Sequence, residues 1–79
     1  MNRQDIVTSI AFSLLNILNE QTKSEIMVCD NKDLFKYHFT IGVIIRRDYL
    51  PQFNWVGDTD EIVHDILKEI SCILRSCVI

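Results

Sequence analysis

The stretch of sequence that decides the fold is residues 58–77, which read D-T-D-E-I-V-H-D-I-L-K-E-I-S-C-I-L-R-S-C. Ile62, Ile66, Ile70 and Ile73 recur there every three or four residues. On an α-helix this spacing gathers them into one apolar stripe, whereas a strand would show a period of two. The pattern therefore predicts a helix with one buried face. Beside the stripe lie Val63, Leu67, Leu74 and Cys77.

The start of this helix is marked by acidic residues. Asp58 and Glu61 have the spacing of a capping box, in which the first side chain accepts a hydrogen bond from a backbone N–H of the first turn. Together with Asp60 they place three carboxylates at the N-terminal end, where the helix dipole favours negative charge. The sequence thus predicts a helix over residues 59–76.

A second apolar stripe predicts a helix over residues 4–20. Ile6, Ile10, Leu14 and Ile17 follow one helical path, and the arc is widened by further apolar side chains. A wide arc on a thinly charged helix is typical of a helix packed by more than one neighbour. We expect this helix to lie centrally or in a dimer interface. The residues that widen the arc are Val7, Ala11, Leu15 and Leu18.

The middle of the chain is ambiguous between helix and strand. Residues 21–33 are polar apart from the knot 26–28, which fits a short extra helical turn or the tail of the first helix. Residues 36–46 alternate like a strand but also fit a helix capped by Asp33. Gly42 would cost such a helix about 1 kcal/mol unless another backbone packs against it.

The fold that we predict is all-α, a small bundle of three main helices near residues 4–20, 33–49 and 59–76. The alternative is an α+β fold in which a hairpin of residues 25–30 and 36–46 packs on two helices. Pro51 is expected to end the second helix, and residues 51–57 are expected to form a loop that closes at Gly57.

Length and composition limit the range of functions. The 79 residues form one domain, 1–79, and 48% of them are hydrophobic while 24% are charged. A chain of this length buries only about 60% of its unfolded surface, so its stability can depend on a partner. The net charge of −3 and the pI near 5.1 argue against nucleic acid as the partner.

The cysteine pattern and the apolar runs point to a cytosolic protein without a membrane anchor. Cys29, Cys72 and Cys77 are odd in number and lack the C-x-x-C spacing, so we expect reduced thiols that act as small buried hydrophobes. The N-terminus shows no signal peptide. The longest apolar run is far shorter than the roughly 20 residues that span a bilayer.

No set of residues in the sequence has the spacing of a catalytic or metal site, and we predict neither an enzyme nor a cofactor. His64 has Asp60 and Glu61 one turn earlier and fits a helix-surface position; His38 fits a buried or boundary histidine. Two histidines do not supply the four ligands of a structural zinc site. Arg46 and the following Arg47 are expected either to end a helix or to pair with the acidic start of the last helix.

The middle and last segments resemble a family of small uncharacterised bacterial domains. The resemblance rests on His38-Phe39-x-x-Gly42-x-x-Ile45-Arg46-Arg47, and then on Asp58-Thr59-Asp60-Glu61-Ile62-Val63 with Ile66-Leu67. It covers about residues 34–70. The family pattern has an Asn where this chain has Arg47 and an aromatic residue where it has Ile44, and its second motif carries a Pro and a Ser that are absent here. The resemblance implies two motifs on packed helices, with no catalytic residues to transfer, and it favours helix for residues 36–46.

Small acidic relatives of this kind resemble the immunity proteins of bacterial toxin–immunity loci, including those of contact-dependent growth inhibition. We therefore expect a cytosolic protein-binding module that neutralises a toxin domain by direct binding. The alternative is a structural or regulatory homodimer formed through the first helix.

The expected docking surface combines two aromatic residues with the acidic start of the last helix. No Lys or Arg occurs between Arg47 and Lys68, so an acidic block lies beside a loop with aromatic side chains. Aromatic residues are enriched among binding hot spots, and acids on the rim steer a basic partner. The alternative is that the aromatic pair folds back on the core while the acids only cap the helix. The predicted partner-binding residues are Phe53, Trp55, Asp58, Asp60, Glu61 and Asp65.

Overall fold

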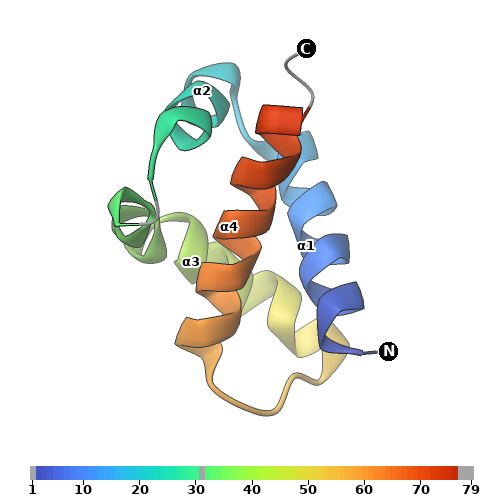
Figure 1. Ribbon diagram of the computed structural model, residues 1–79. Helices are drawn as coiled ribbons and strands as arrows, with labels where there is room; N and C mark the ends of the chain where they lie inside the picture. Colours follow the sequence, from blue (N-terminus) through green and yellow to red (C-terminus); the bar gives the residue numbers. More distant parts are fainter. Residues whose placement is uncertain (1, 31, 77–79) are drawn as a thin grey trace.

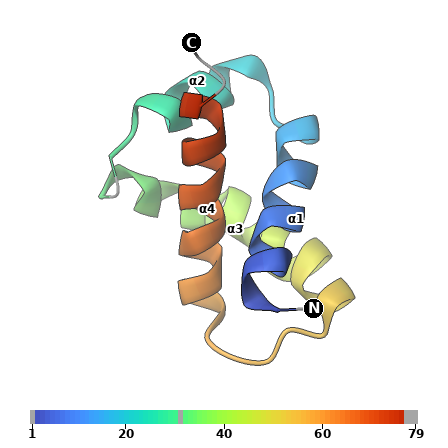
Figure 2. The same cartoon turned by 45° about the vertical axis from the view of Figure 1, so that its right-hand side comes forward.

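Helix α4, Thr59–Ser76, forms the axis of the structure, a computed structural model that describes residues 2–30 and 32–76. Figure 1 shows α4 between α1, Arg3–Ile17, on one side and α2, Glu20–Val28, with α3, Ile41–Ile44, on the other. The view turned by 45° in Figure 2 shows the same neighbours. The prediction of an all-α fold is confirmed, because every regular element among the described residues is helical.

The core is built around the apolar stripe of α4, as the sequence predicts. Ile62, Ile66 and Ile70 are fully buried, and Ile73 is partly buried against them. Opposite this stripe lies the apolar arc of α1. That arc contributes Ile6, Val7, Ile10, Ala11 and Leu14 to the core.

The first helix ends earlier than predicted. Residues 4–20 are not one helix, because Leu18 and Asn19 adopt extended backbone between α1 and α2. The side chain of Asn19 accepts a hydrogen bond of 2.8 Å from the N–H of Thr22, which caps α2 and favours a new start over continuation. Ile17, predicted to lie in the buried stripe, is 59% exposed at the end of α1.

Helix α2 is attached to α4 through its last carbonyl groups. The Ser71 hydroxyl donates to the carbonyl of Ile26 at 3.4 Å. The Arg75 guanidinium donates to the carbonyls of Met27 at 3.0 Å and Cys29 at 2.7 Å. The Arg75 bonds satisfy carbonyl groups that a helix end leaves without partners, whereas the Ser71 bond adds to the one that the Ile26 carbonyl accepts from the Cys29 N–H.

The predicted helix 33–49 is a series of short helical turns with different windings. The 3₁₀ helix η1 spans Asp33–Phe39, α3 follows, and a π-helical turn, η2, spans Ile45–Tyr49. Thr40 separates η1 from α3 with a non-helical backbone. Helical winding also continues beyond Pro51, because Pro51 occupies the first turn of η3, Leu50–Phe53, where its missing N–H costs nothing. The predicted loop therefore begins at Asn54, whose backbone is left-handed.

Gly42 lets α3 approach α4 closely. A Cβ at this position would lie 3.2 Å from Val63 Cγ1 and 3.3 Å from the Arg46 guanidinium. The two nearest neighbours are side chains of α4 and η2, and the backbone carbonyl of Tyr37 in η1 follows at 3.6 Å, so a backbone also packs against Gly42 as the sequence suggested. This approach brings η1 and the start of α4 together, and the hollow described below lies between them.

The prediction that the cysteines are buried is confirmed for Cys29 and wrong for Cys72. Cys29 is buried in the core, whereas Cys72 is exposed on α4. Cys77 lies outside the described residues. The i, i+3, i+4 stripe of α4 explains the difference, because Cys72 falls between the buried Ile70 and the partly buried Ile73, on the outer face of the helix.

Candidate partner-binding site

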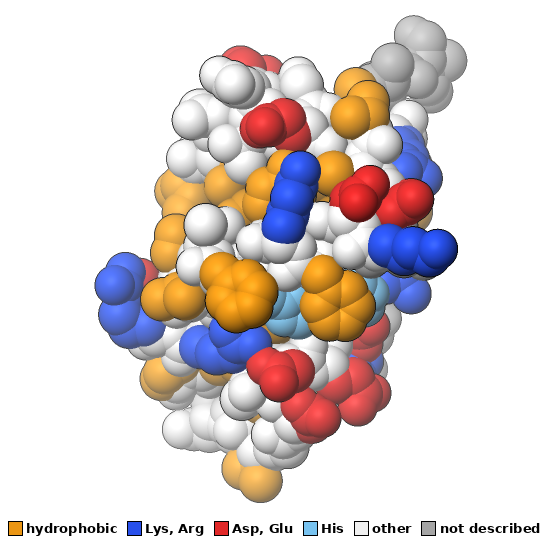
Figure 3. Space-filling view, turned by 90° about the vertical axis from the view of Figure 1, so that its left-hand side faces the viewer, with side chains coloured by type: hydrophobic (Ala, Val, Ile, Leu, Met, Phe, Trp, Pro, Cys, Tyr) orange, Lys and Arg blue, Asp and Glu red, His pale blue; other side chains and the backbone are white. Residues whose placement is uncertain are grey.

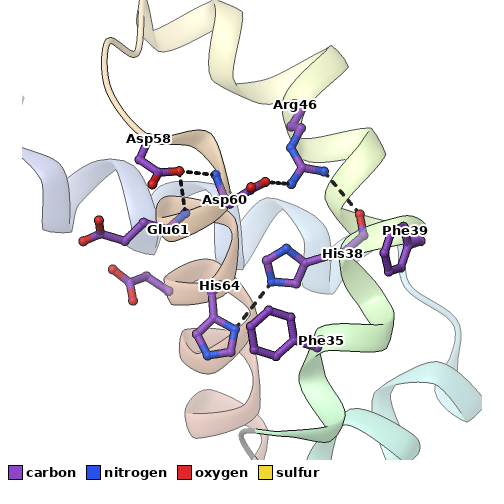
Figure 4. Close-up of a pocket in the computed structure, with 9 residues that line it drawn as sticks. Phe35, His38, Phe39, Arg46, Asp58, Asp60, Glu61 and His64 are labelled. Carbon is purple, nitrogen blue, oxygen red and sulfur yellow. Dashed lines mark hydrogen bonds and ion pairs between the residues drawn. The ribbon is translucent and has the colours of Figure 1, made fainter.

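A hollow of about 570 Å³ opens on the surface between the start of α4 and η1. Figure 4 shows its two walls, one of carboxylates from α4 and the residue before it, the other of aromatic and histidine rings. Figure 3 shows the same face from outside, with hydrophobic and histidine side chains next to a group of acidic ones. The lining residues are Phe35, His38, Phe39, Arg46, Asp58, Asp60, Glu61, His64 and Asp65.

The acidic wall is positioned by the capping of α4. Asp58 Oδ1 accepts hydrogen bonds from the N–H groups of Asp60 at 2.9 Å and Glu61 at 3.3 Å. This confirms the predicted cap. Glu61 does not complete a capping box among the described residues, because its side chain lies 3.4 Å from the Arg3 guanidinium of α1. Arg3 also pairs with Asp65.

Arg46 joins the two walls. Its guanidinium donates to the carbonyl of His38 at 3.3 Å and forms an ion pair with Asp60. The predicted pairing of the arginines with the acidic helix start is therefore confirmed for Arg46. It is wrong for Arg47, which instead makes two bonds of 2.9 Å to the adjacent Asp48. A one-residue step along a helical turn rotates the side chain by about 100°, so only one of the two arginines faces α4.

The aromatic wall is a cluster of three rings, in which Phe35 covers the two histidines. Phe35 lies nearly parallel to both His38 and His64, with ring centroids 5.1 Å apart in each case. The two histidines are joined by a contact of 3.5 Å between His38 Nε2 and His64 Nδ1. His38 is buried, as predicted, and His64 is half-buried rather than a free surface residue.

The environment of His38 favours its neutral form. Burial lowers the pKa of His38 below its usual value of 6.5, and the positive charges of His64 (when protonated) and Arg46 lower it further. Asp60 acts in the opposite direction. At neutral pH the His38 ring is therefore an uncharged, flat part of the aromatic wall, with no capacity to repel a cation.

The negative charge of the hollow is only partly neutralised. Four carboxylates line it, while two guanidinium groups, those of Arg46 and Arg3, pair with three of them. Among the described residues, the Asp58 carboxylate forms no ion pair. Two negative charges remain, and the N-terminus of α4 offsets about half a charge. The hollow is therefore a net anionic site.

The structure brings together four of the six predicted partner-binding residues: Asp58, Asp60, Glu61 and Asp65 line the hollow. Phe53 and Trp55 do not line it, because both are half-buried and pack against the core. The Trp55 ring lies over Gly57, where a Cβ would come within 3.2 Å of it. This placement matches the alternative in which the two aromatics fold back on the core.

Phe35 and Phe39 supply the exposed aromatic surface that was predicted for Phe53 and Trp55. Phe35 is 61% exposed and Phe39 is 83% exposed, both on η1. The 3₁₀ winding turns Leu34 and Tyr37 inward and leaves these two rings outside. Their spacing of four residues was visible in the sequence, but the alternation of residues 36–46 obscured which side would be exposed.

No family model, curated protein or solved structure matches this chain. The resemblance to small bacterial domains accordingly stays a prediction. In the part of the chain that the structure describes, no three residues of the metal-binding types group around a common point. Among residues 2–30 and 32–76, no helix has both the length and the apolar character needed to cross a membrane.

Proposed function

We propose that this chain is a protein-binding module that docks a basic partner on its acid–aromatic face, the surface formed by Phe35, Phe39 and the acidic hollow. The single observation that carries the proposal is the position of two exposed phenyl rings beside a net anionic hollow. Exposed aromatic groups give a partner apolar area to bury, and acidic groups on the rim select a basic one. Apolar side chains that are exposed singly need no explanation, but here Phe35 and Phe39 are exposed on the same short helix and line the same hollow.

The most concrete form of the proposal is an immunity protein that acts in the bacterial cytosol and neutralises a toxin domain by direct binding. The resemblance of residues 34–70, the small size and the acidic charge support it. Basic toxin domains that attack nucleic acid carry the positive surface that this face complements. Inhibition then results from occupation of the toxin surface, without catalysis or a cofactor.

The test compares two phenylalanine substitutions of the same size on different elements. Phe39→Ser removes an exposed ring of the acid–aromatic face, and Phe12→Ser removes a ring of α1 that is 53% exposed and does not line the hollow. The partner for titration calorimetry is a basic toxin domain from the gene next to that of this chain, and a neighbourhood without such a domain would contradict the immunity form of the proposal. With that domain, Phe39→Ser should lose at least about tenfold in affinity, as expected for a hot-spot aromatic. Phe12→Ser should change it less than about twofold.

The opposite ranking would contradict the proposal. If Phe12→Ser weakened the complex and Phe39→Ser left it unchanged, the partner would bind through α1. Thermal unfolding of both variants serves as the control, because side chains this exposed contribute little to the core and should leave the melting temperature nearly unchanged.

A second candidate function is a homodimer formed through α1. The observation in its favour is that α1 leaves Phe12 and Ile17 more than half exposed. Sedimentation analysis separates the two candidates. A tight dimer that Phe12→Ser dissociates supports the second candidate, whereas a monomer at concentrations that saturate toxin binding excludes it.

A further inference from the structure

The acid–aromatic face holds a feature more specific than negative charge. In its aromatic wall the Phe35 ring covers the two histidine rings, at angles of 18° to His38 and 30° to His64. The other side of the Phe35 ring is accessible, since Phe35 is 61% exposed. An exposed aromatic ring next to carboxylates suits a side chain that has both an apolar stem and a planar cation.

We infer that the hollow receives an arginine side chain of the partner, with its apolar stem against the exposed Phe35 ring and its guanidinium hydrogen-bonded to the carboxylates of the opposite wall. This inference rests on the proposed function and names the group that the partner presents. Guanidinium is planar, stacks on aromatic faces and binds carboxylates with two parallel N–H groups, whereas the lysine ammonium is a compact and strongly hydrated point charge.

The carboxylate available for this contact is that of Asp58. Asp60 is paired with Arg46, and both Glu61 and Asp65 are paired with Arg3. Asp58 uses Oδ1 to accept the two N–H groups of the α4 cap. Asp58 is exposed at the rim of the hollow, so a guanidinium from outside can reach its carboxylate.

The hollow is also large enough to admit one side chain. Its volume of about 570 Å³ lies inside the range of small-ligand sites, about 300–1,000 Å³. The neutral state of His38 matters here, because a protonated ring in the wall would repel the guanidinium. The resident Arg46 and Arg3 already pair with carboxylates of the same wall and thus show which cation this wall accommodates.

The experiment titrates three small probes into the complete chain and follows the ring signals of its two histidines by NMR. The probes are N-acetyl-arginine amide, N-acetyl-lysine amide and N-acetyl-citrulline amide, the last of which has the shape of arginine without its charge. We expect saturable shifts with the arginine probe, at least about fivefold weaker binding of the lysine probe, and no saturable binding of the citrulline probe.

A matched variant tests the assigned carboxylate. Asp58→Asn keeps a side-chain oxygen that caps α4, because Asn and Asp are equally good N-caps, but it removes the charge. It should weaken binding of the arginine probe by about threefold or more, while the melting temperature falls only by the small amount that loss of a charge at the helix N-terminus causes. Glu20→Gln on α2 is the control for a general change of net charge and should have no effect on the probe, because Glu20 pairs with Lys23 and does not line the hollow.

Each outcome separates the inference from the proposed function. Equal binding of arginine and lysine probes, or equal shifts with citrulline, would overturn the recognition of guanidinium. An absence of saturable shifts with every probe would overturn it as well, even if Phe39→Ser still abolishes binding of the toxin domain. If the arginine probe binds as expected and Phe39→Ser has no effect on the toxin domain, the site stands while the proposed partner is wrong.

Discussion

Arg46 should hold the two walls of the hollow together mainly through the carbonyl of His38, and replacement by Met tests this. Met keeps the apolar stem and removes the guanidinium. The hydrogen bond to the His38 carbonyl has a charged donor and is worth about 1.5 kcal/mol, the lower end of the range for such bonds, because the Arg46 side chain is 32% exposed. The ion pair to Asp60 adds about 0.2–1 kcal/mol, because Asp60 is 76% exposed.

The expected loss for Arg46→Met is therefore about 1.7–2.5 kcal/mol in the free energy of unfolding. For a chain of this size that corresponds to a fall of roughly 7–20 °C in the melting temperature. Asp60→Asn should lose less than about 1 kcal/mol, since it breaks only the exposed pair. Urea unfolding of the two single variants and the double variant gives the coupling energy between the two side chains.

A coupling energy that equals the whole loss of Arg46→Met would refute this reasoning. The ion pair would then carry the contact and the carbonyl bond would contribute nothing. An Asp60→Asn variant as unstable as Arg46→Met would have the same meaning.

Three further predictions concern the scaffold. Ile10→Ala, at a fully buried position, should destabilise the fold by about 2–5 kcal/mol, whereas Ile17→Ala on the same helix should cost less than about 1 kcal/mol because that side chain is 59% exposed. Urea denaturation compares the two variants, and equal losses would contradict the assigned packing of α1. Burial lowers the pKa of His38 from 6.5, so between the two pKa values the unfolded chain binds a proton that the folded chain does not, and stability should fall as the pH drops below about 6.5 and level off below the folded pKa. His38→Gln should remove this component from melting temperatures recorded against pH, and an unchanged pH dependence would show that His38 is not its source. Arg75→Gln should cost about 1–3 kcal/mol and raise amide hydrogen exchange at the end of α2, because the guanidinium satisfies two carbonyl groups there; unchanged exchange would exclude this attachment.

The elements that could be predicted from the sequence are those whose signal is local and periodic. The stripe of Ile62, Ile66 and Ile70 needs only the helical period, and the Asp58 cap needs only its distance from the first turn. The pairing of Arg46 with α4 followed from charge pattern alone. These features depend on residues within one or two turns, or on two segments of opposite charge.

The features that were not predicted depend on competition between local alternatives. Asn19 can lie inside a helix or cap a new one, and the attachment of α2 to Ser71 and Arg75 favours the second outcome. The windings of residues 33–53 change from 3₁₀ to α to π, and no period in the sequence reports such changes. Packing against α4, including the close approach at Gly42, stabilises them.

Of the two walls of the candidate site, the acidic one was predicted from the sequence and the aromatic one was not. Its acidic wall follows from the helix start, so four carboxylates were identified correctly as neighbours. The aromatic wall joins Phe35 and His38 to His64, which follows His38 by 26 positions. Such a contact depends on how η1 crosses α4, and Trp55, the most conspicuous aromatic in the sequence, packs against the core instead.

The measurement that tests the central claim most directly is the footprint of the toxin domain on this chain, mapped by amide chemical shifts of the free and bound protein. We predict that the largest changes fall in residues 33–39 and 58–65, which form the acid–aromatic face, and that the affinity decreases with rising salt. A footprint confined to α1 and α2, with residues 33–39 unchanged, would contradict the account.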